Sequence, residues 1–177
     1  ACLDEHGYSE TSLGRVQKRA GVSRGALTHH FPTREDMMVA TVEQILEPVR
    51  FRGRKPGRAL PEDSHASIRS HLVRLWTDTV NTVEGRALFE ILVAARTDEE
   101  LERRIAPALR DYDQEVGEGL SALYRSRGGV DEDVRRLWTI CRIFLRGLHV
   151  QERFGGDRAG TAALMERFAE LIADQIE

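Results

Sequence analysis

Residues 11–36 read TSLGRVQKRAGVSRGALTHHFPTRED, a stretch with the spacing of two short helices joined by a tight turn. Gly21 interrupts the first helical pattern and supplies the backbone freedom that a sharp turn needs. Ser23 follows as a candidate N-cap of the second helix, because its hydroxyl can accept a hydrogen bond from a first-turn N–H. Val22 and Leu27 are expected to pack between the two helices. The stretch therefore predicts a helix-turn-helix.

The residues on both sides extend this helical pattern. Gly7 is the expected left-handed end of a preceding short helix, and Thr11 is the expected N-cap of the first helix of the pair. Thr33 and Asp36 have the spacing of a capping box, which predicts the start of a longer helix. Four helices are therefore expected before the middle of the chain.

Helical periodicity continues almost to the C-terminus, since apolar residues recur three and four positions apart. This pattern predicts an all-α fold of about nine helices. Residues 1–50 are expected to form the helix-turn-helix domain with a connecting helix, and residues 51–61 a linker rich in glycine and basic residues. Residues 62–177 are expected to form a second helical domain. Residues 77–83 have a β-prone composition, so the helix end near them stays open.

The last two expected helices carry more apolar surface than one buried face requires. The helix within residues 131–155 is apolar almost all round, which predicts burial on more than one side. The final helix has two apolar tracks, Leu164–Phe168–Leu171 and Met165–Ala169–Ile172–Ile176. We expect one track to face the core and the other to face a partner.

Charge is distributed unevenly along the chain. The formal net charge of the 177 residues is −3, which argues against a non-specific basic coat on nucleic acid. Residues 1–58 nevertheless hold ten basic and seven acidic residues, a net charge of +3, and residues 59–177 carry −6. The N-terminal third is therefore the part expected to meet an anion. The basic residues at its end are expected to belong to a linker rather than to a DNA-binding patch: Arg50, Arg52, Arg54, Lys55 and Arg58.

Several classes of protein are excluded by what the sequence lacks. Cys2 and Cys141 lie far apart with no CxxC spacing, which excludes a disulfide scaffold and a zinc framework and fits a reducing cytoplasm. No apolar run approaches the ~20 residues of a membrane span, and no signal peptide is visible, so no membrane partner is expected. HExxH, GxSxG and P-loop motifs are absent, and the six histidines lack metal-ligand spacing. We expect no cofactor, no metal and no enzymatic activity.

One run of motifs within residues 7–38 is more specific than a general helix-turn-helix. Its elements are Gly7-Tyr8, Thr11-Ser12, Ala20-Gly21-Val22-Ser23, Gly25, His30-Phe31 and Arg34. This pattern resembles the tetracycline-repressor (TetR) family of transcription regulators. The resemblance covers about the first quarter of the chain, and the rest is similar in helix count and length only.

The second helix of the pair is expected to project side chains outward, where they could enter a major groove. The resemblance assigns base or backbone contacts with operator DNA to Arg24, Thr28 and His29, with Gly25 allowing close approach of the backbone. It assigns phosphate contacts to His30, Arg34, Thr11 and Ser12. The partners that the resemblance implies are a double-stranded DNA operator, a small-molecule effector and a second copy of the chain.

A ligand cavity and a dimer interface are expected in the second domain. The candidate ligand-binding residues, for which core packing is the alternative, are Trp76, Phe89, Leu92, Trp138, Cys141 and Arg142. Arg142 interrupts an apolar helix, so it can pair with an acid, face a partner or hold an anionic ligand, and the last is our preferred hypothesis. The candidate dimer-interface residues are Phe144, Leu148, Met165, Phe168, Ala169 and Ile172.

The sequence therefore favours a homodimeric transcription regulator, most simply a repressor released from a near-palindromic operator by a small ligand. An alternative is a helical ligand-binding or enzymatic protein whose N-terminal helix pair is only structural. A regulator that answers to a protein partner, or to no ligand, also stays open.

Overall fold

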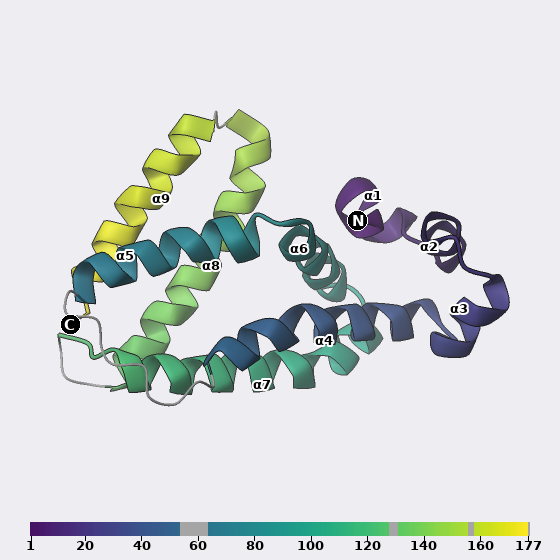
Figure 1. The fold of residues 1–177 in the computed structure, drawn as a ribbon, viewed down its shortest axis with the longest axis horizontal. Helices are drawn as coiled ribbons and strands as arrows, with labels where there is room; N and C mark the ends of the chain where they lie inside the picture. The colour runs from purple at the N-terminus through teal and green to yellow at the C-terminus, as the bar shows by residue number, and fades with distance from the viewer. Residues whose placement is uncertain (54–63, 128–130, 156–157, 177) are drawn as a thin grey trace. The chain divides into compact units, whose positions relative to one another are not determined.

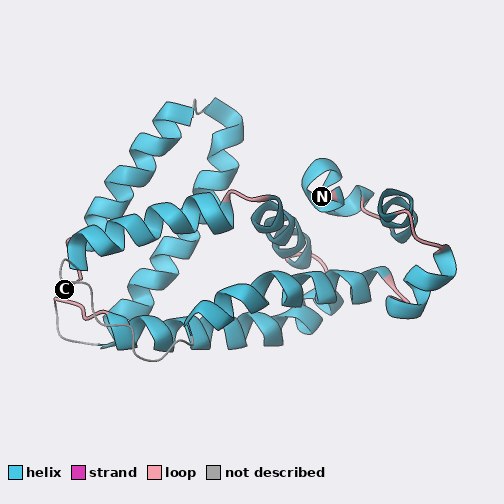
Figure 2. Cartoon of the chain, in the orientation of Figure 1, coloured by secondary structure: helices cyan, strands magenta, loops and turns pink. Residues whose placement is uncertain are grey.

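The computed structural model describes residues 1–53, 64–127, 131–155 and 158–176, and this part of the chain is helical almost throughout (Figure 1 and Figure 2). The expected all-α fold is confirmed, since the described residues form nine α-helices and one π-helical segment. The elements are α1 (Cys2–Glu10), α2 (Leu13–Ala20), α3 (Arg24–His30), α4 (Arg34–Gly53), α5 (Ser64–Leu75), η1 (Trp76–Val80), α6 (Val83–Ala95), α7 (Glu99–Leu123), α8 (Asp131–Gly155) and α9 (Arg158–Ala173). None of the described helices has both the length and the hydropathy needed to cross a membrane.

The chain divides into two compact units that do not follow its linear order. The first consists of Ala1–Val49 and Val83–Tyr112, and the second of Arg50–Thr82 and Asp113–Glu177. The expected linker at 51–61 coincides with the start of the second unit, but its residues 51–53 still belong to α4 and its residues 54–61 lie outside the described part. Helix α6 and the first half of α7 belong to the N-terminal unit, whereas the sequence placed them in the second domain, residues 62–177.

Helix α6 belongs to the first unit because it packs against α1. Arg86 Nε donates to Asp4 Oδ1 at 2.5 Å, and both side chains are largely buried. The backbone N–H of Tyr8 donates to Glu90 Oε2 at 3.3 Å. Gly7 has a φ of 74°, as expected, but it kinks α1 rather than ending it. These polar contacts join residues about eighty positions apart, which no local sequence pattern reveals.

The second unit is built around the packing of α5 and η1 against α8 and α9. Arg69 on α5 donates from Nη2 to Glu166 Oε2 on α9 at 2.8 Å. The rings of Phe144 and Phe168 stack with their centroids 3.8 Å apart, which joins α8 to α9. The helix end that the sequence left open becomes the π-helical segment, closed by a 2.8 Å hydrogen bond from Asn81 N to the carbonyl oxygen of residue 76.

Helices α8 and α9 each present a buried side and an exposed apolar side. The expectation that α8 is buried on more than one side is wrong within the single chain, because three large apolar side chains on it are at least half exposed, and two on α9 are exposed to a similar degree. They are Ile140, Ile143, Phe154, Leu164 and Leu171. The track through Met165, Ala169 and Ile172 on α9, and Ile176 just after it, is buried, which confirms that one of the two tracks faces the core.

Candidate functional site

The helix pair α2–α3 has a hydrogen-bonded cap at the start of each helix. Ser12 Oγ accepts a hydrogen bond from Arg15 N at 3.2 Å, and Ser23 Oγ accepts one from Ala26 N at 3.2 Å. Gly21 ends α2 in the left-handed conformation with a φ of 68°, which a residue with a Cβ adopts only at a cost. The helix-turn-helix predicted from the sequence is therefore present, with its turn chemistry as expected.

Thr11 has a different place from the one expected. The N-cap of α2 is Ser12, so the prediction that Thr11 caps this helix is wrong. Thr11 is only 1% exposed, and its hydroxyl donates to the carbonyl oxygen of Gly7 at 2.7 Å. A buried hydroxyl with its hydrogen already donated has little left for a phosphate. Ser12, in contrast, is exposed at the helix start and stays a candidate for that contact.

The candidate base-contacting helix α3 exposes most of the side chains assigned to it. Arg24, His29 and His30 are exposed, and no ion pair of Arg24 occurs within the described residues. The rings of His29 and His30 contact each other edge to face, with their centroids 5.4 Å apart. Thr28 is half-buried, and its hydroxyl donates to the carbonyl oxygen of residue 24 at 2.9 Å.

Two residues of the expected helix-pair packing differ in exposure. Leu27 is buried and packs inside the unit, as predicted, but Val22 is 41% exposed, so it does not lock the helices together. A Cβ placed on Gly25 would meet no atom within 4 Å, and the residue is exposed. Packing inside the chain therefore does not require glycine at position 25, which leaves the close approach of an external group as a reason for it.

Arg34 is committed to the chain's own backbone. Its Nε donates to the carbonyl oxygen of Thr11 at 2.8 Å, its Nη2 donates to that of Tyr8, and its guanidinium carbon lies 4.0 Å from the centroid of the Tyr8 ring. These contacts join the start of α4 to the end of α1. Arg34 therefore has a structural role within the chain, which uses two of its five N–H groups, and the phosphate contact that the resemblance assigns to it stays a prediction.

The predicted capping box at the start of α4 is confirmed. Asp36 Oδ2 accepts hydrogen bonds from Thr33 N at 2.8 Å and Thr33 Oγ1 at 2.7 Å, while Asp36 N donates to Thr33 Oγ1 at 3.1 Å. Arg104 on α7 donates to the other carboxylate oxygen at 2.5 Å. The hydrogen bonds from Thr33, together with Arg104, lower the pKa of Asp36 to about 2.

This lowered pKa predicts an acid-dependent loss of stability. The unfolded-state pKa is about 3.9, so the contribution of Asp36 is complete above that value and disappears as the pH falls towards 2. We expect Asp36→Asn to lower the free energy of unfolding at pH 7 and to flatten its decline below about pH 4. Urea unfolding across this range measures both effects, with Glu43→Gln, an exposed carboxylate on the same helix, as the control. A parallel decline in Asp36→Asn and the parent protein would contradict the assignment.

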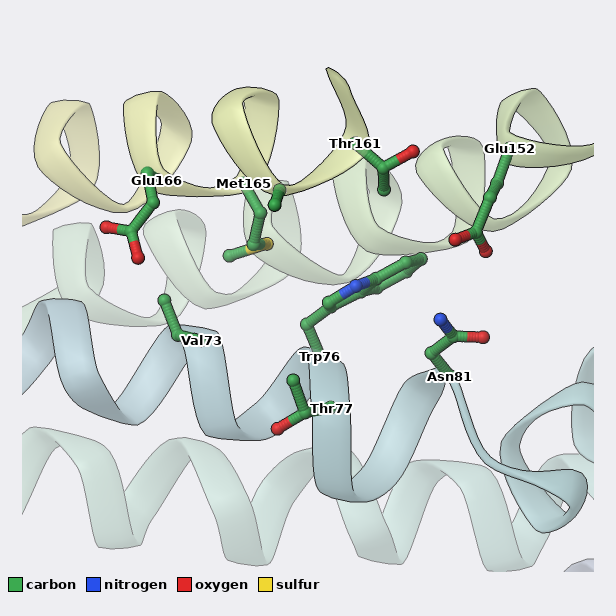
Figure 3. A pocket seen from close by; sticks show the side chains of 9 residues that line it. Val73, Trp76, Thr77, Asn81, Glu152, Thr161, Met165 and Glu166 are labelled. Atoms are coloured by element: carbon green, nitrogen blue, oxygen red, sulfur yellow. The ribbon is translucent and has the colours of Figure 1, made fainter. Parts of the chain in front are cut away.

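A cavity of about 570 Å³ lies in the second unit (Figure 3). Its lining comes from α5, η1, α8, α9 and the residue after η1: Val73, Trp76, Thr77, Asn81, Glu152, Thr161, Ala162, Met165 and Glu166. Of the candidate ligand-binding residues, Trp76 alone lines it. The others in the lining were missed because they converge from helices far apart in sequence. Met165 had been assigned to the dimer interface instead.

A second cavity contains two of the other candidates but is much smaller. Trp138 and Cys141 line a space of about 40 Å³, which admits water-sized molecules rather than an organic effector. Burial raises the pKa of the Cys141 thiol to about 12, so the thiol stays protonated and inert near neutral pH. These two residues therefore behave as core, the alternative considered for them. No group of residues suited to hold a metal ion occurs in the part of the chain that the structure describes.

The remaining ligand-binding candidates lie elsewhere. Phe89 and Leu92 are half-buried on α6 in the first unit and line neither cavity. Arg142 forms an ion pair with Asp113 on α7 and has a side chain only 19% exposed. Our hypothesis that Arg142 holds an anionic ligand is replaced by another of the three considered, pairing with an acid.

The candidate dimer-interface residues lie mainly in the core of the second unit. Of the six, Phe144 is half-buried and the other five are buried, with exposed fractions between 0% and 9%: Leu148, Met165, Phe168, Ala169 and Ile172. The apolar surface available to a partner comes from neighbouring positions instead. On α8, Ile140, Ile143 and Val150 recur at helical spacing and are 50%, 65% and 40% exposed.

The capped helix pair α2–α3 defines the chain as a helix-turn-helix protein. Comparison with known proteins gives the same class. Residues 1–41 match the family described as bacterial regulatory proteins, tetR family. An uncharacterized HTH-type transcriptional regulator of Mycobacterium tuberculosis is 35% identical over 119 residues, which cover 67% of this chain and 60% of that protein. The HTH-type transcriptional repressor AcnR of Corynebacterium diphtheriae is 27% identical over 182 residues, covering 99% of this chain and 85% of the repressor.

Solved structures are similar over nearly the whole chain. A crystal structure of a TetR-family transcriptional regulator from Rhodococcus sp. has a TM-score of 0.70 at 17% identity and covers 97% of this chain and 93% of that one. Salmonella enterica GusR has a TM-score of 0.66 at 20% identity, covering 98% and 86%. At these identities the likeness concerns the fold alone. The chain belongs to the tetR family of bacterial regulatory proteins. Its match spans 60% of the length of the mycobacterial relatives.

Proposed function

We propose that the protein is a transcription regulator that binds operator DNA through α3. The observation that carries this proposal is the surface of α3, where exposed Arg24, Gly25 and His29 lie directly after a capped, glycine-ended turn. A short helix held in this way can enter a major groove, where an arginine can donate two hydrogen bonds to guanine. The net charge of +3 on residues 1–58 does not carry this proposal, because five of its ten basic residues lie at positions 50–58, in the expected linker.

The regulator acts as a homodimer on a near-palindromic site. One chain presents one recognition helix, and two-fold symmetry supplies the second at about one duplex turn. The exposed apolar positions on α8 and α9 offer a self-complementary surface, because large exposed apolar side chains at helical spacing are typical of interfaces. The acidic remainder of the chain, at −6, is unsuited to lie against DNA.

A small molecule releases the repressor from its operator. The cavity of about 570 Å³ is within the size range of organic-ligand sites, roughly 300–1,000 Å³. A ligand there changes DNA affinity only if it binds the DNA-competent and DNA-incompetent states with different affinities. We propose regulation rather than catalysis. The alternative of a ligand-binding or enzymatic protein with a merely structural helix pair is disfavoured by the free α3 surface.

Binding-site selection from random duplexes tests the DNA-binding role. We expect enrichment of a two-fold symmetric sequence, followed by tight binding in fluorescence anisotropy. Arg24→Ala should weaken binding to the selected site roughly tenfold and relax the preference at one base position per half-site, because one base contact contributes about 1–3 kcal/mol. Arg103→Ala is the matched control, since Arg103 is an exposed arginine on α7 that pairs with Glu100. It should bind as the parent protein does.

Two results would contradict the proposed role of α3 in DNA binding. If no duplex is enriched at low salt, where phosphate contacts are strongest, α3 is not a recognition helix and the ligand-binding alternative gains support. If Arg24→Ala and Arg103→Ala weaken DNA binding equally for all sequences, the loss reflects only the removal of one positive charge from the protein. The role of Arg24 in sequence recognition is then wrong.

A further inference from the structure

The ionisable side chains that line the large cavity are acidic. Glu152 on α8 and Glu166 on α9 are its two carboxylates, and the described lining contains no lysine, arginine or histidine. The other polar lining groups are the neutral side chains of Thr77, Asn81 and Thr161. A ligand that enters this cavity therefore meets negative charge.

The two carboxylates differ in how their charge is compensated. Glu166 accepts a hydrogen bond from Arg69 Nη2 at 2.8 Å, so an arginine already balances it. Glu152 is half-buried, and within the described residues it forms neither an ion pair nor a hydrogen bond. A cation bound beside this carboxylate would complement its negative charge. The uncompensated charge of the cavity thus lies at Glu152.

Trp76 begins the π-helical segment and lines the cavity together with Glu152. The hydrogen bond from Asn81 N to the carbonyl oxygen of Trp76 closes a wider turn than an α-helix has, and both residues line the cavity. Figure 3 shows the indole of Trp76 extending below Thr161, with the carboxylate of Glu152 near its outer end and Asn81 on the side opposite Thr161. The carboxylate of Glu152 thus supplies the attraction for a positively charged group, and the indole of Trp76 supplies apolar surface beside it.

We propose that the cavity binds an organic cation with an apolar body. Its charged nitrogen pairs with the Glu152 carboxylate, and its apolar part lies against Trp76, Met165 and Val73. Anions are repelled by Glu152, and neutral molecules of the same shape lose its attraction. This assignment rests on the proposed function in one respect, because it makes this cation the effector of the regulator.

A tryptophan-fluorescence titration tests the assignment. Trp138→Phe leaves Trp76 as the single indole of the chain, so its emission reports on this cavity. The probes are benzyltrimethylammonium, its neutral isostere neopentylbenzene and the anion phenylmethanesulfonate. We expect saturable binding of the cation, at least tenfold weaker binding of the neutral isostere, and no binding of the anion.

A charge-removing variant assigns the effect to one residue. Glu152→Gln in the same background should weaken binding of the cation at least tenfold and leave the neutral isostere unaffected, because the amide keeps the size of the side chain and removes its charge. Glu118→Gln is the matched control, an exposed glutamate on α7 outside the cavity. The preference of the parent protein for cation over isostere tests the proposal even if the variant folds poorly.

The outcomes separate this inference from the proposed function. Equal binding of cation and isostere, no response of Trp76 to the cation, or unchanged affinity in Glu152→Gln would overturn the cation site. DNA binding of the same Trp138→Phe protein is measured in parallel on the selected duplexes. Cation binding that depends on Glu152 in a protein that binds no DNA would support the cavity assignment and refute the regulator. Intact DNA binding without a cation response would refute the cavity assignment alone.

Discussion

Arg34→Ala should lower the free energy of unfolding by about 2–3 kcal/mol, because it removes two charge-assisted hydrogen bonds and a stacked aromatic contact at once. The carbonyl group of Thr11 would lose the donor that Arg34 supplies, while the carbonyl group of Tyr8 would keep the hydrogen bond from Thr11 N at 3.1 Å. Equilibrium unfolding in urea measures the effect. Arg34→Lys should recover part of the loss, since an ammonium group cannot reproduce the forked donation of a guanidinium.

The same variant separates a structural role from a phosphate contact. If Arg34 acts inside the chain, the fall of DNA affinity with salt keeps its slope under conditions where Arg34→Ala is folded. A phosphate contact would instead reduce that slope by about one unit and leave the unfolding free energy near that of the parent protein. This second result would confirm the role that the resemblance assigned. Arg103→Ala, an exposed arginine, provides the baseline for both measurements.

Ile143→Glu should convert the protein to a monomer and reduce operator affinity a hundredfold or more. Ile143 is 65% exposed on α8, so a glutamate there stays hydrated in the single chain but would be buried in an interface. Two linked recognition helices bind far more tightly than one, because the second contact forms at a high effective concentration. Sedimentation velocity measures the first effect and anisotropy on the selected duplex measures the second.

The control for this variant is another exposed apolar residue away from α8 and α9. Val93 on α6 is 44% exposed, and Val93→Glu should leave both the assembly state and the DNA affinity unchanged. A dimer that persists in Ile143→Glu would mean that another surface forms the interface. Loss of dimer in both variants would point to general destabilisation, which the unfolding curves would reveal.

Features that depend on neighbouring residues were predicted well from the sequence. Gly21 in its left-handed turn, the cap at Ser23 and the capping box of Thr33 with Asp36 involve residues at most three positions apart, so each is encoded by local backbone chemistry. The N-cap of α2 was placed one residue early, at Thr11, because two hydroxyl residues compete there. Both residues have extended backbone angles, and the cap is Ser12 because its Oγ accepts from Arg15 N, whereas the hydroxyl of Thr11 donates to the carbonyl oxygen of Gly7.

Features that depend on distant residues were predicted poorly. Arg34 has the position of a phosphate-binding side chain in the motif, yet its partners are carbonyl groups more than twenty residues earlier in the chain. Arg142 looked like a ligand-binding cation in an apolar helix until Asp113 of α7 proved to be its partner. In both cases the sequence identified an arginine that needs a partner. The partner, a carbonyl group for Arg34 and a carboxylate for Arg142, came from another helix or its end.

The amino-acid sequence by itself determined the helical class, the helix-turn-helix and the membership that its motif indicates, because caps, turns and apolar periodicity act over a few residues. The tertiary structure alone decided which apolar track of α9 is buried and which side of α8 stays exposed. It also decided that Trp76 meets Glu152 in a cavity while Trp138 lies against core. The physical reason is that burial and charge compensation depend on which helices pack together, and that packing joins residues far apart in the chain.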